Sequence, residues 1–127
     1  MSDPATVLIA EDNDFVRMQI VRYLMDEGYN IREATDGSEA IEICKGEKVD
    51  LAIVDVRMEP VDGFGFIRAI RGNNSKIPVI LVTGDNNPDI LSKSSEWGVG
   101  AVLIKPVQKE RLVTAVARSL DAAKRRA

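Results

Sequence analysis

A run of four apolar residues, Leu51 to Val54, is followed directly by the carboxylate of Asp55. The run does not alternate between apolar and polar residues, and it lies between Asp50 and the loop-forming segment 56–60. A short, uninterrupted run of this kind is typical of a strand buried on both faces. Open parallel sheets place their ligand chemistry at the carboxyl ends of the strands. The sequence therefore predicts that Asp55 lies at the functional edge of a parallel sheet.

Five strands are predicted, and amphipathic segments separate them along the chain. The second, residues 29–34, alternates between apolar and polar residues as an edge strand would. Five strands that alternate with five helices are typical of an α/β fold, with a parallel sheet covered by helices on both faces. Right-handed crossovers favour the flavodoxin-like strand order 2-1-3-4-5 at this length. The predicted strands cover residues 6–10, 29–34, 49–55, 77–82 and 101–104, and the predicted helices begin near Asp14, Asp36, Asp62, Pro88 and Leu112.

The chain of 127 residues fits one domain. We expect its core to span residues 6–120, with residues 121–127 as a tail or the start of a linker. The net charge of −3 argues against nucleic acid as a direct partner. No apolar run reaches the ~18 residues needed to cross a membrane. A single cysteine, Cys44, and an N-terminus unlike a signal peptide predict a cytoplasmic location.

Histidine is absent from the sequence. Its absence excludes serine–histidine and cysteine–histidine catalysis within this chain, and it excludes metal sites built on imidazole. Carboxylates, hydroxyls and amines remain as the groups that carry any chemistry.

Polar residues follow four of the five predicted strands. Glu11 and Asp12 follow the first strand, and Asp55 ends the third. Thr83 ends the fourth strand and Lys105 follows the fifth. Each of these residues alone is commonly a helix cap or a solvated group. Because the carboxyl ends of parallel strands share one edge of the sheet, we expect all five side chains to converge there.

The predicted cluster needs a cation. Each pair of carboxylates 4 Å apart is destabilised by about 4 kcal/mol at an effective dielectric constant of 20. The charge of −3 on the three acids is balanced by a divalent ion together with Lys105. Oxygen ligands without histidine or cysteine favour Mg²⁺. The hydroxyl of Thr83 and the ammonium of Lys105 suit phosphoryl oxygens, so the set predicts that Asp55 is a nucleophile that accepts a phosphoryl group.

The same residues resemble the receiver domain of two-component response regulators, over roughly residues 6–120. The matching motifs lie at the predicted strand ends and in the loop after the third strand. They are Glu11–Asp12, Asp55 with Met58 and Asp62–Gly63 downstream, Thr83–Gly84, and Lys105–Pro106.

The resemblance implies a role for each residue of the cluster. Asp55 accepts the phosphoryl group from a phosphohistidine on a histidine kinase or phosphotransfer protein, a role that suits a chain without histidine. Thr83 binds the phosphoryl group and moves with it, and Lys105 forms the ion pair. The Lys105–Pro106 peptide bond is expected to be cis. The implied ligands of Mg²⁺ are Glu11, Asp12, Asp55 and the backbone carbonyl of Arg57.

The resemblance also implies how the signal leaves the domain. Phosphorylation changes the face formed by the fourth helix, the fifth strand and the fifth helix, within residues 90–120. This face then regulates a downstream protein or pairs with a second copy of the domain. On this view the chain is not an enzyme, because it catalyses only its own phosphorylation and dephosphorylation.

Three features depart from the family pattern. The proline usual after Met58 is displaced by one residue, since Glu59 precedes Pro60. Val102 stands where the family usually has a tyrosine or phenylalanine that turns with the threonine, so we expect a switch without an aromatic ring. Arg57 and Asp85 lie two residues after Asp55 and Thr83, at positions that flank the route of attacking water. We hypothesise that they pair and slow hydrolysis of the phosphoaspartate.

Two other functions fit the predicted fold less well. A metal-dependent phosphohydrolase with an aspartyl nucleophile needs a second acid two residues after the nucleophile, where this chain has Arg57. A flavin or dinucleotide binder needs a glycine-rich or hydroxyl-rich loop after the first strand. The acidic segment 11–14 stands there instead and would repel phosphate.

Overall fold

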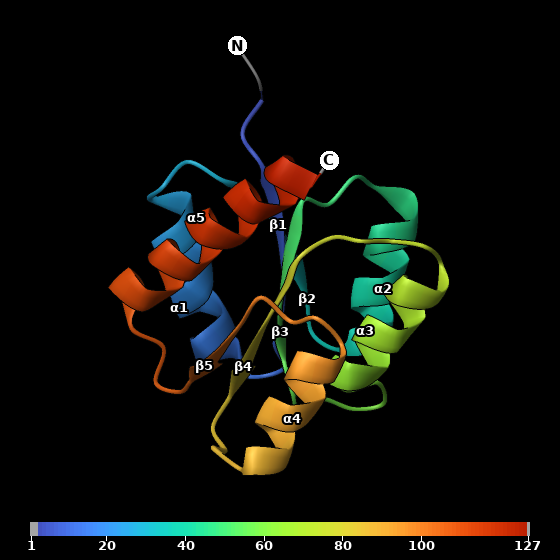
Figure 1. Cartoon of the computed structure of the whole chain (residues 1–127). Coiled ribbons are helices and arrows are strands. Elements are labelled where there is room, and N and C mark those ends of the chain that lie inside the picture. Colours follow the sequence, from blue (N-terminus) through green and yellow to red (C-terminus); the bar gives the residue numbers. More distant parts are fainter. Residues whose placement is uncertain (1–2, 127) are drawn as a thin grey trace.

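The computed structural model describes residues 3–126, and a five-stranded parallel sheet forms its centre (Figure 1). Strands and helices alternate along the chain, as the apolar pattern predicts. The strands are β1 (Thr6–Ala10), β2 (Asn30–Ala34), β3 (Leu51–Asp55), β4 (Val79–Thr83) and β5 (Ala101–Ile104). The helices are α1 (Asp14–Met25), α2 (Gly37–Gly46), α3 (Gly63–Gly72), α4 (Pro88–Glu96) and α5 (Lys109–Arg126).

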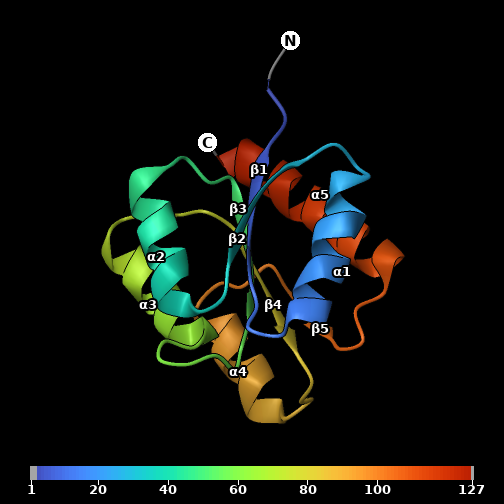
Figure 2. The ribbon, with the colours of Figure 1, turned by 180° about the vertical axis from the view of Figure 1, so that it is seen from behind.

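The strand order is β2-β1-β3-β4-β5, which confirms the predicted flavodoxin-like topology. Helices α1 and α5 cover one face of the sheet, and α2, α3 and α4 cover the other (Figures 1 and 2). The register pairs Asp55 of β3 with Val82 of β4, and Thr83 of β4 with Ile104 of β5. Asp55, Thr83 and Lys105 therefore lie within two residues of each other in register, along the carboxyl edge of the sheet.

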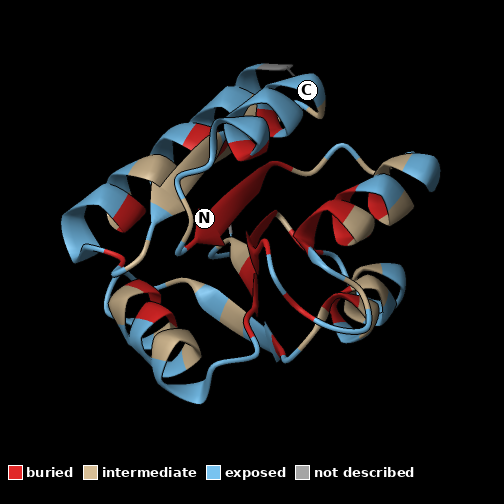
Figure 3. Ribbon diagram, turned by 90° about the horizontal axis from the view of Figure 1, so that it is seen from below, coloured by how far each residue is buried: buried red, intermediate tan, exposed pale blue. Residues whose placement is uncertain are grey.

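The sheet separates two apolar cores, because successive side chains of a strand point to opposite faces. In β1, Leu8 packs in the core under α2, α3 and α4, whereas Ile9 packs in the core under α1 and α5. Strands β3 and β4 are buried along their whole length, as their uninterrupted apolar runs predict (Figure 3). Asp55, which ends β3, is thus held in a fixed position, because the strand is packed on both faces.

Polar side chains cap the first four helices at the predicted positions. Asn13, rather than Asp14, caps α1 by accepting a hydrogen bond from the backbone N–H of Val16. The other caps are Asp36, Asp62 and Asn87. Cap residues of this kind satisfy backbone N–H groups that the first turn of a helix leaves unpaired. They also set where each strand-to-helix loop ends, and so shape the functional edge.

The last helix differs from its predicted limits. Helix α5 begins at Lys109, three residues before Leu112, and continues to Arg126. Residues 121–126, expected as a tail or linker, are therefore helical. Among residues 3–126, no helix is long and apolar enough to cross a membrane.

Gly63 brings the loop after β3 back against the strand end. Its backbone N–H donates to the carbonyl of Val56 at 3.0 Å. A Cβ atom at this position would lie 2.6 Å from the carbonyl oxygen of Asp55, a distance that real side chains do not tolerate. The Asp62–Gly63 pair of the sequence therefore combines a helix cap with a close backbone approach beside Asp55.

Candidate functional site

The carboxyl edge of the sheet holds all the residues that the sequence singles out at strand ends. Glu11, Asp55 and Thr83 are buried there, Lys105 is half-buried, and Asp12 is exposed. Buried ionised groups are unfavourable unless they are paired or bind a metal. The burial of two acids and one hydroxyl at a single edge therefore marks this place as a chemical site.

The ammonium of Lys105 bridges the two buried carboxylates. Its Nζ atom lies 2.8 Å from Oε1 of Glu11 and 2.8 Å from Oδ2 of Asp55. The other oxygen of Asp55, Oδ1, accepts a hydrogen bond from the backbone N–H of Arg57 at 3.1 Å. Both oxygens of Asp55 are thus oriented by donors from separate elements, which fixes the direction of the carboxylate.

The carboxyl group of Glu11 is hard to ionise in this place. Burial and its contact with Asp55 raise its pKa to about 7, although Lys105 and the N–H of Asn13 act in the opposite direction. Burial alone would lower the pKa of Lys105, but the two carboxylates beside it outweigh that effect and raise it. The site therefore carries more negative charge than one ammonium can neutralise.

The same three acids form a candidate metal site. One oxygen from each of Glu11, Asp12 and Asp55 lies within 4.8 Å of the others. Among the described residues, no donor makes a hydrogen bond of good geometry to Oε1 of Glu11, although this atom is buried. The backbone of Arg57 lies beside Asp55, since its N–H binds that carboxylate. An all-oxygen set whose two buried carboxylates share a single ammonium fits a hard divalent cation.

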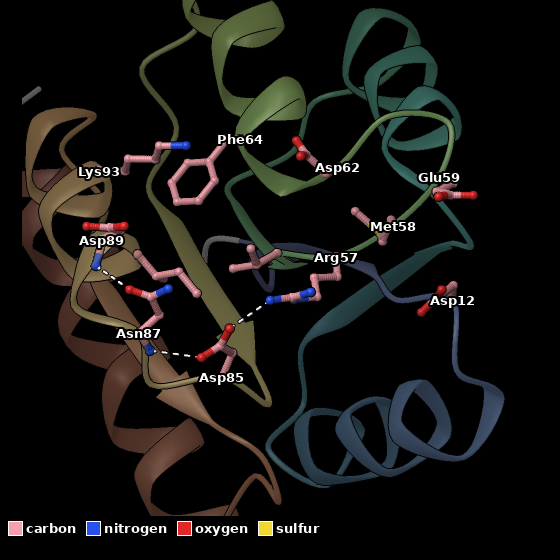
Figure 4. Close-up of a pocket in the computed structure, with 12 residues that line it drawn as sticks. Asp12, Arg57, Met58, Glu59, Asp62, Phe64, Asp85, Asn87, Asp89 and Lys93 are labelled. Carbon is pink, nitrogen blue, oxygen red and sulfur yellow. Dashed lines mark hydrogen bonds and ion pairs between the residues drawn. The ribbon is translucent and has the colours of Figure 1, made fainter.

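An ion pair spans the mouth of the site (Figure 4). The guanidinium of Arg57 lies 2.7 Å from Oδ2 of Asp85, and its side chain is 75% exposed. The backbone N–H of Asp85 donates to the hydroxyl oxygen of Thr83 at 3.0 Å. A hollow of about 760 Å³ opens beside this pair, with Asp12 on one side and α4 on the other. The mouth is therefore open to water but crossed by one salt bridge.

The other two departures from the family pattern, the displaced Pro60 and Val102, can also be located in the structure. The peptide bonds Lys105–Pro106 and Glu59–Pro60 are both cis, and only the first was expected from the sequence. Val102 is half-buried, pairs in register with Leu81 and packs against the core under α2, α3 and α4. The side chain at this position therefore lies toward the interior, not toward the mouth of the site.

Sequence reasoning missed one participant, Asn87. The sequence predicts only that a helix begins near Pro88, the residue after it. In the structure the backbone N–H of Asn87 also donates to Oδ1 of Asp85 at 3.0 Å, which ties the helix cap to the ion pair. The spacing Asp85-x-Asn87-Pro88 is the signal that could have indicated this contact, because such side chains often bind a backbone N–H two residues on.

Comparison with known proteins agrees with this geometry. A family model described as the response regulator receiver domain matches residues 7–117. The transcriptional regulatory protein PdtaR of Mycobacterium tuberculosis is 36% identical over 114 residues, which cover 89% of this chain and 55% of that protein. The sensor kinase CckA of Brucella abortus is 37% identical over 126 residues, which cover 95% of this chain and 13% of that protein.

A solved structure shows the same fold. The chemotaxis protein CheY4 of Vibrio cholerae superposes with a TM-score of 0.86 at 29% identity, over 91% of this chain and 98% of that one. The chain thus spans little more than half of PdtaR and about an eighth of CckA, but nearly all of CheY4. With a matching family model over most of its length and the buried Asp55 at its centre, the chain belongs to the response regulator receiver domains of two-component systems.

Proposed function

We propose that Asp55 accepts a phosphoryl group from a phosphohistidine on a partner protein, and that the chain signals through this modification. The observation that carries the proposal is the Lys105 bridge. It holds one oxygen of Asp55 while the Arg57 N–H holds the other, at a buried strand end. A carboxylate oriented in this way is prepared to act as a nucleophile.

The transfer forms one bond and breaks one. An oxygen of Asp55 attacks the phosphorus, and the phosphorus–nitrogen bond to the donor histidine breaks with its electron pair left on the imidazole. The ammonium of Lys105 is placed to stabilise the negative charge on the phosphoryl oxygens. The hydroxyl of Thr83, on the neighbouring strand, is placed to donate a hydrogen bond to one of them. The phosphoryl group is later lost to water, which restores the carboxylate.

We propose Mg²⁺ as the cofactor, held by Glu11, Asp12, Asp55 and the backbone carbonyl of Arg57. The raised pKa of Glu11 supports this assignment, because burial and the neighbouring Asp55 both disfavour its negative charge when no metal is bound. When bound, the ion supplies that charge and neutralises the incoming phosphoryl oxygens. Histidine and cysteine ligands, which softer metals prefer, are absent from the acidic group.

The alternative function, a metal-dependent phosphohydrolase, is disfavoured by the residue after Val56. Such enzymes use an acid two residues beyond the nucleophile, and here Arg57 points its guanidinium at Asp85. We therefore assign no substrate turnover to the chain beyond its own phosphorylation and dephosphorylation. We also propose a cytoplasmic location, in keeping with the free, half-buried thiol of Cys44.

We propose two partner surfaces. For the histidine donor we propose α1, which begins two residues after Asp12 and exposes apolar side chains. Phe15 is 86% exposed and Met18 is 58% exposed, and both lie near the start of the helix. For a downstream protein or a second copy we propose the face of α4, β5 and α5, where Leu91 and Ile104 are exposed. Large exposed apolar side chains that gather on one surface commonly mark binding sites.

Phosphorylation of Asp55 can be tested with a small donor. We expect incubation with acetyl phosphate and Mg²⁺ to add one phosphoryl group, measured by intact mass, and Asp55→Asn to abolish the gain. Asp50→Asn is the matched control, because Asp50 lies just before the other end of β3 and its side chain accepts a hydrogen bond from the N–H of Thr6. A gain that persists in Asp55→Asn would place the chemistry on another residue.

The raised pKa of Glu11 predicts how metal binding depends on pH. Since the ion must displace the proton, Mg²⁺ affinity measured by calorimetry should be about tenfold weaker at pH 6 than at pH 8. In Glu11→Gln the affinity should be low at both values. Equal dissociation constants for the wild type at the two pH values would contradict the assignment of Glu11 as a ligand.

The raised pKa of Glu11 also predicts how the stability of the metal-free protein depends on pH. The folded state holds this proton more tightly than the unfolded state, in which the pKa is near 4.5. The contribution of Glu11 is therefore fully present below pH 4.5, and it is lost as the pH rises through 7. In EDTA, the free energy of unfolding should fall between pH 5 and pH 8 relative to that of Glu11→Gln. Urea titrations at each pH measure the difference.

The ion pair at the mouth predicts the lifetime of the phosphoaspartate. If Arg57 and Asp85 restrict attacking water, Arg57→Ala and Asp85→Ala should each shorten the lifetime. Exposed pairs contribute about 0.2–1 kcal/mol, so the expected change is roughly 1.5- to 5-fold. Arg32→Ala is the control, since Arg32 makes a pair of the same length with Glu47 away from the site. Unchanged lifetimes in both test variants would refute the idea.

The exposed side chains of α1 predict selective effects on the histidine donor. A transfer screen first identifies the phosphorylated histidine protein that phosphorylates the wild type fastest. Phe15→Gln and Met18→Gln should slow phosphoryl transfer from that protein. We expect about tenfold, typical of an apolar anchor in an interface. Uptake from acetyl phosphate should stay unchanged, and so should transfer to Leu91→Gln, a control on α4 at a residue whose 55% exposure is close to the 58% of Met18. Equal slowing with both donors would indicate a folding defect instead of lost docking.

A further inference from the structure

We infer that the ion pair of Arg57 and Asp85 couples the phospho-acceptor loop to the N-terminus of α4, so that the start of this helix responds to the charge on Asp55. The inference rests on the proposed phosphorylation of Asp55, and it names the route by which that change leaves the site. Four contacts, each described below, form a path from Asp55 to α4. Figure 4 shows the last three, which lead from Arg57 through Asp85 and Asn87 to Asp89.

The first contacts join Asp55 to the far side of the mouth through Arg57. The backbone N–H of Arg57 donates to Oδ1 of Asp55, while its guanidinium binds Oδ2 of Asp85 at 2.7 Å. Arg57 thus contacts Asp55 through its backbone and contacts Asp85, in the loop after β4, through its side chain. A displacement of the loop after Asp55 therefore acts directly on Asp85.

Asp85 binds in three directions at once. Its backbone N–H donates to the hydroxyl of Thr83, one carboxylate oxygen binds Arg57, and the other accepts from the backbone N–H of Asn87. Asp85 is therefore joined to the site at two points, through Arg57 in the loop after β3 and through Thr83 at the end of β4. Toward α4, Asp85 makes the hydrogen bond with the backbone N–H of Asn87.

Asn87 connects Asp85 to helix α4. It is the cap of α4, and its side chain accepts a hydrogen bond from the backbone N–H of Asp89 at 2.9 Å. Helix α4 has nine residues, of which only Ile90 and Ser94 are buried. A short helix with so little buried surface depends strongly on its cap, because isolated helices of this length are unstable in water.

The strand next to the site offers no equivalent route. Val102 occupies the position in β5 where an aromatic ring could turn with Thr83. Its β-branched side chain has few rotamers, and it packs against the core under α2, α3 and α4. The path through Asp85 and Asn87 leads to the same face of the molecule without any need for Val102 to move.

Phosphorylation of Asp55 changes the charges around the guanidinium of Arg57. The phosphoryl group adds negative charge to Asp55, which the backbone N–H of Arg57 binds, and guanidinium groups such as that of Arg57 bind phosphoryl oxygens well. Arg57 then divides its donors between two anions, and the carboxylate of Asp85 faces a new negative charge. Because the exposed pair is weak, this redistribution needs little energy. The hold of Asp85 on Asn87 loosens, while Arg57 stays at the mouth.

Backbone NMR of the whole chain tests the coupling. The amide signals of residues 90–96 are compared before and after addition of excess acetyl phosphate and Mg²⁺, at a phosphoryl occupancy measured by intact mass. In the wild type we expect phosphorylation to shift these signals. At equal occupancy, Asp85→Ala and Arg57→Ala should lose most of that shift, although their own unphosphorylated spectra show a folded protein.

Two further variants separate coupling from simple disturbance. Asp85→Glu keeps the carboxylate and should recover part of the response, whereas Arg32→Ala, which removes the matched pair with Glu47, should keep all of it. Undiminished shifts of residues 90–96 in Asp85→Ala and Arg57→Ala, at equal occupancy, would overturn the coupling alone. Failure of the wild type to take up any phosphoryl group would overturn the proposed function, and the coupling with it.

Discussion

The ammonium of Lys105, set between two buried carboxylates, is the interaction on which the functional edge depends. Without it, Glu11 and Asp55 would be unpaired charges inside the protein, and removing one member of such a group is strongly destabilising. The position of the ammonium is in turn a product of the sheet, since it follows β5 while the acids come from β1 and β3. Fold and site are therefore linked through one side chain.

The sequence was sufficient to predict most of this arrangement. Uninterrupted apolar runs such as residues 51–54 have few structural solutions, and the crossover rule leaves one common strand order. Parallel strands then bring their final residues together, so Asp55, Thr83 and Lys105 could be assigned to one place without any contact being known. These inferences work because each depends on the backbone pattern and not on the orientation of a side chain.

Other features could not be read from the chain. The pairing of Arg57 with Asp85 could only be hypothesised, because the conformations of two loops, residues 56–62 and 84–87, decide whether the side chains meet. The link from Asp85 to Asn87 depends on the exact turn between β4 and α4, which several sequences of this composition could satisfy in different ways. The first turn of α5, which begins at Lys109, precedes the first apolar residue of the helix at Leu112, so apolar periodicity alone did not place its start.

The attachment of Lys105 to an edge strand has a consequence for how partners act on the site. Among the described residues, β5 has a neighbouring strand only on the side of β4, and its residues are half-buried except Ile104, which is exposed. A protein that binds this edge more tightly in one arrangement of Lys105 than in another shifts the electrostatics around Asp55. Linkage requires the effect to be mutual. The bound effector would then tune how readily the domain is phosphorylated, as well as being recruited by it.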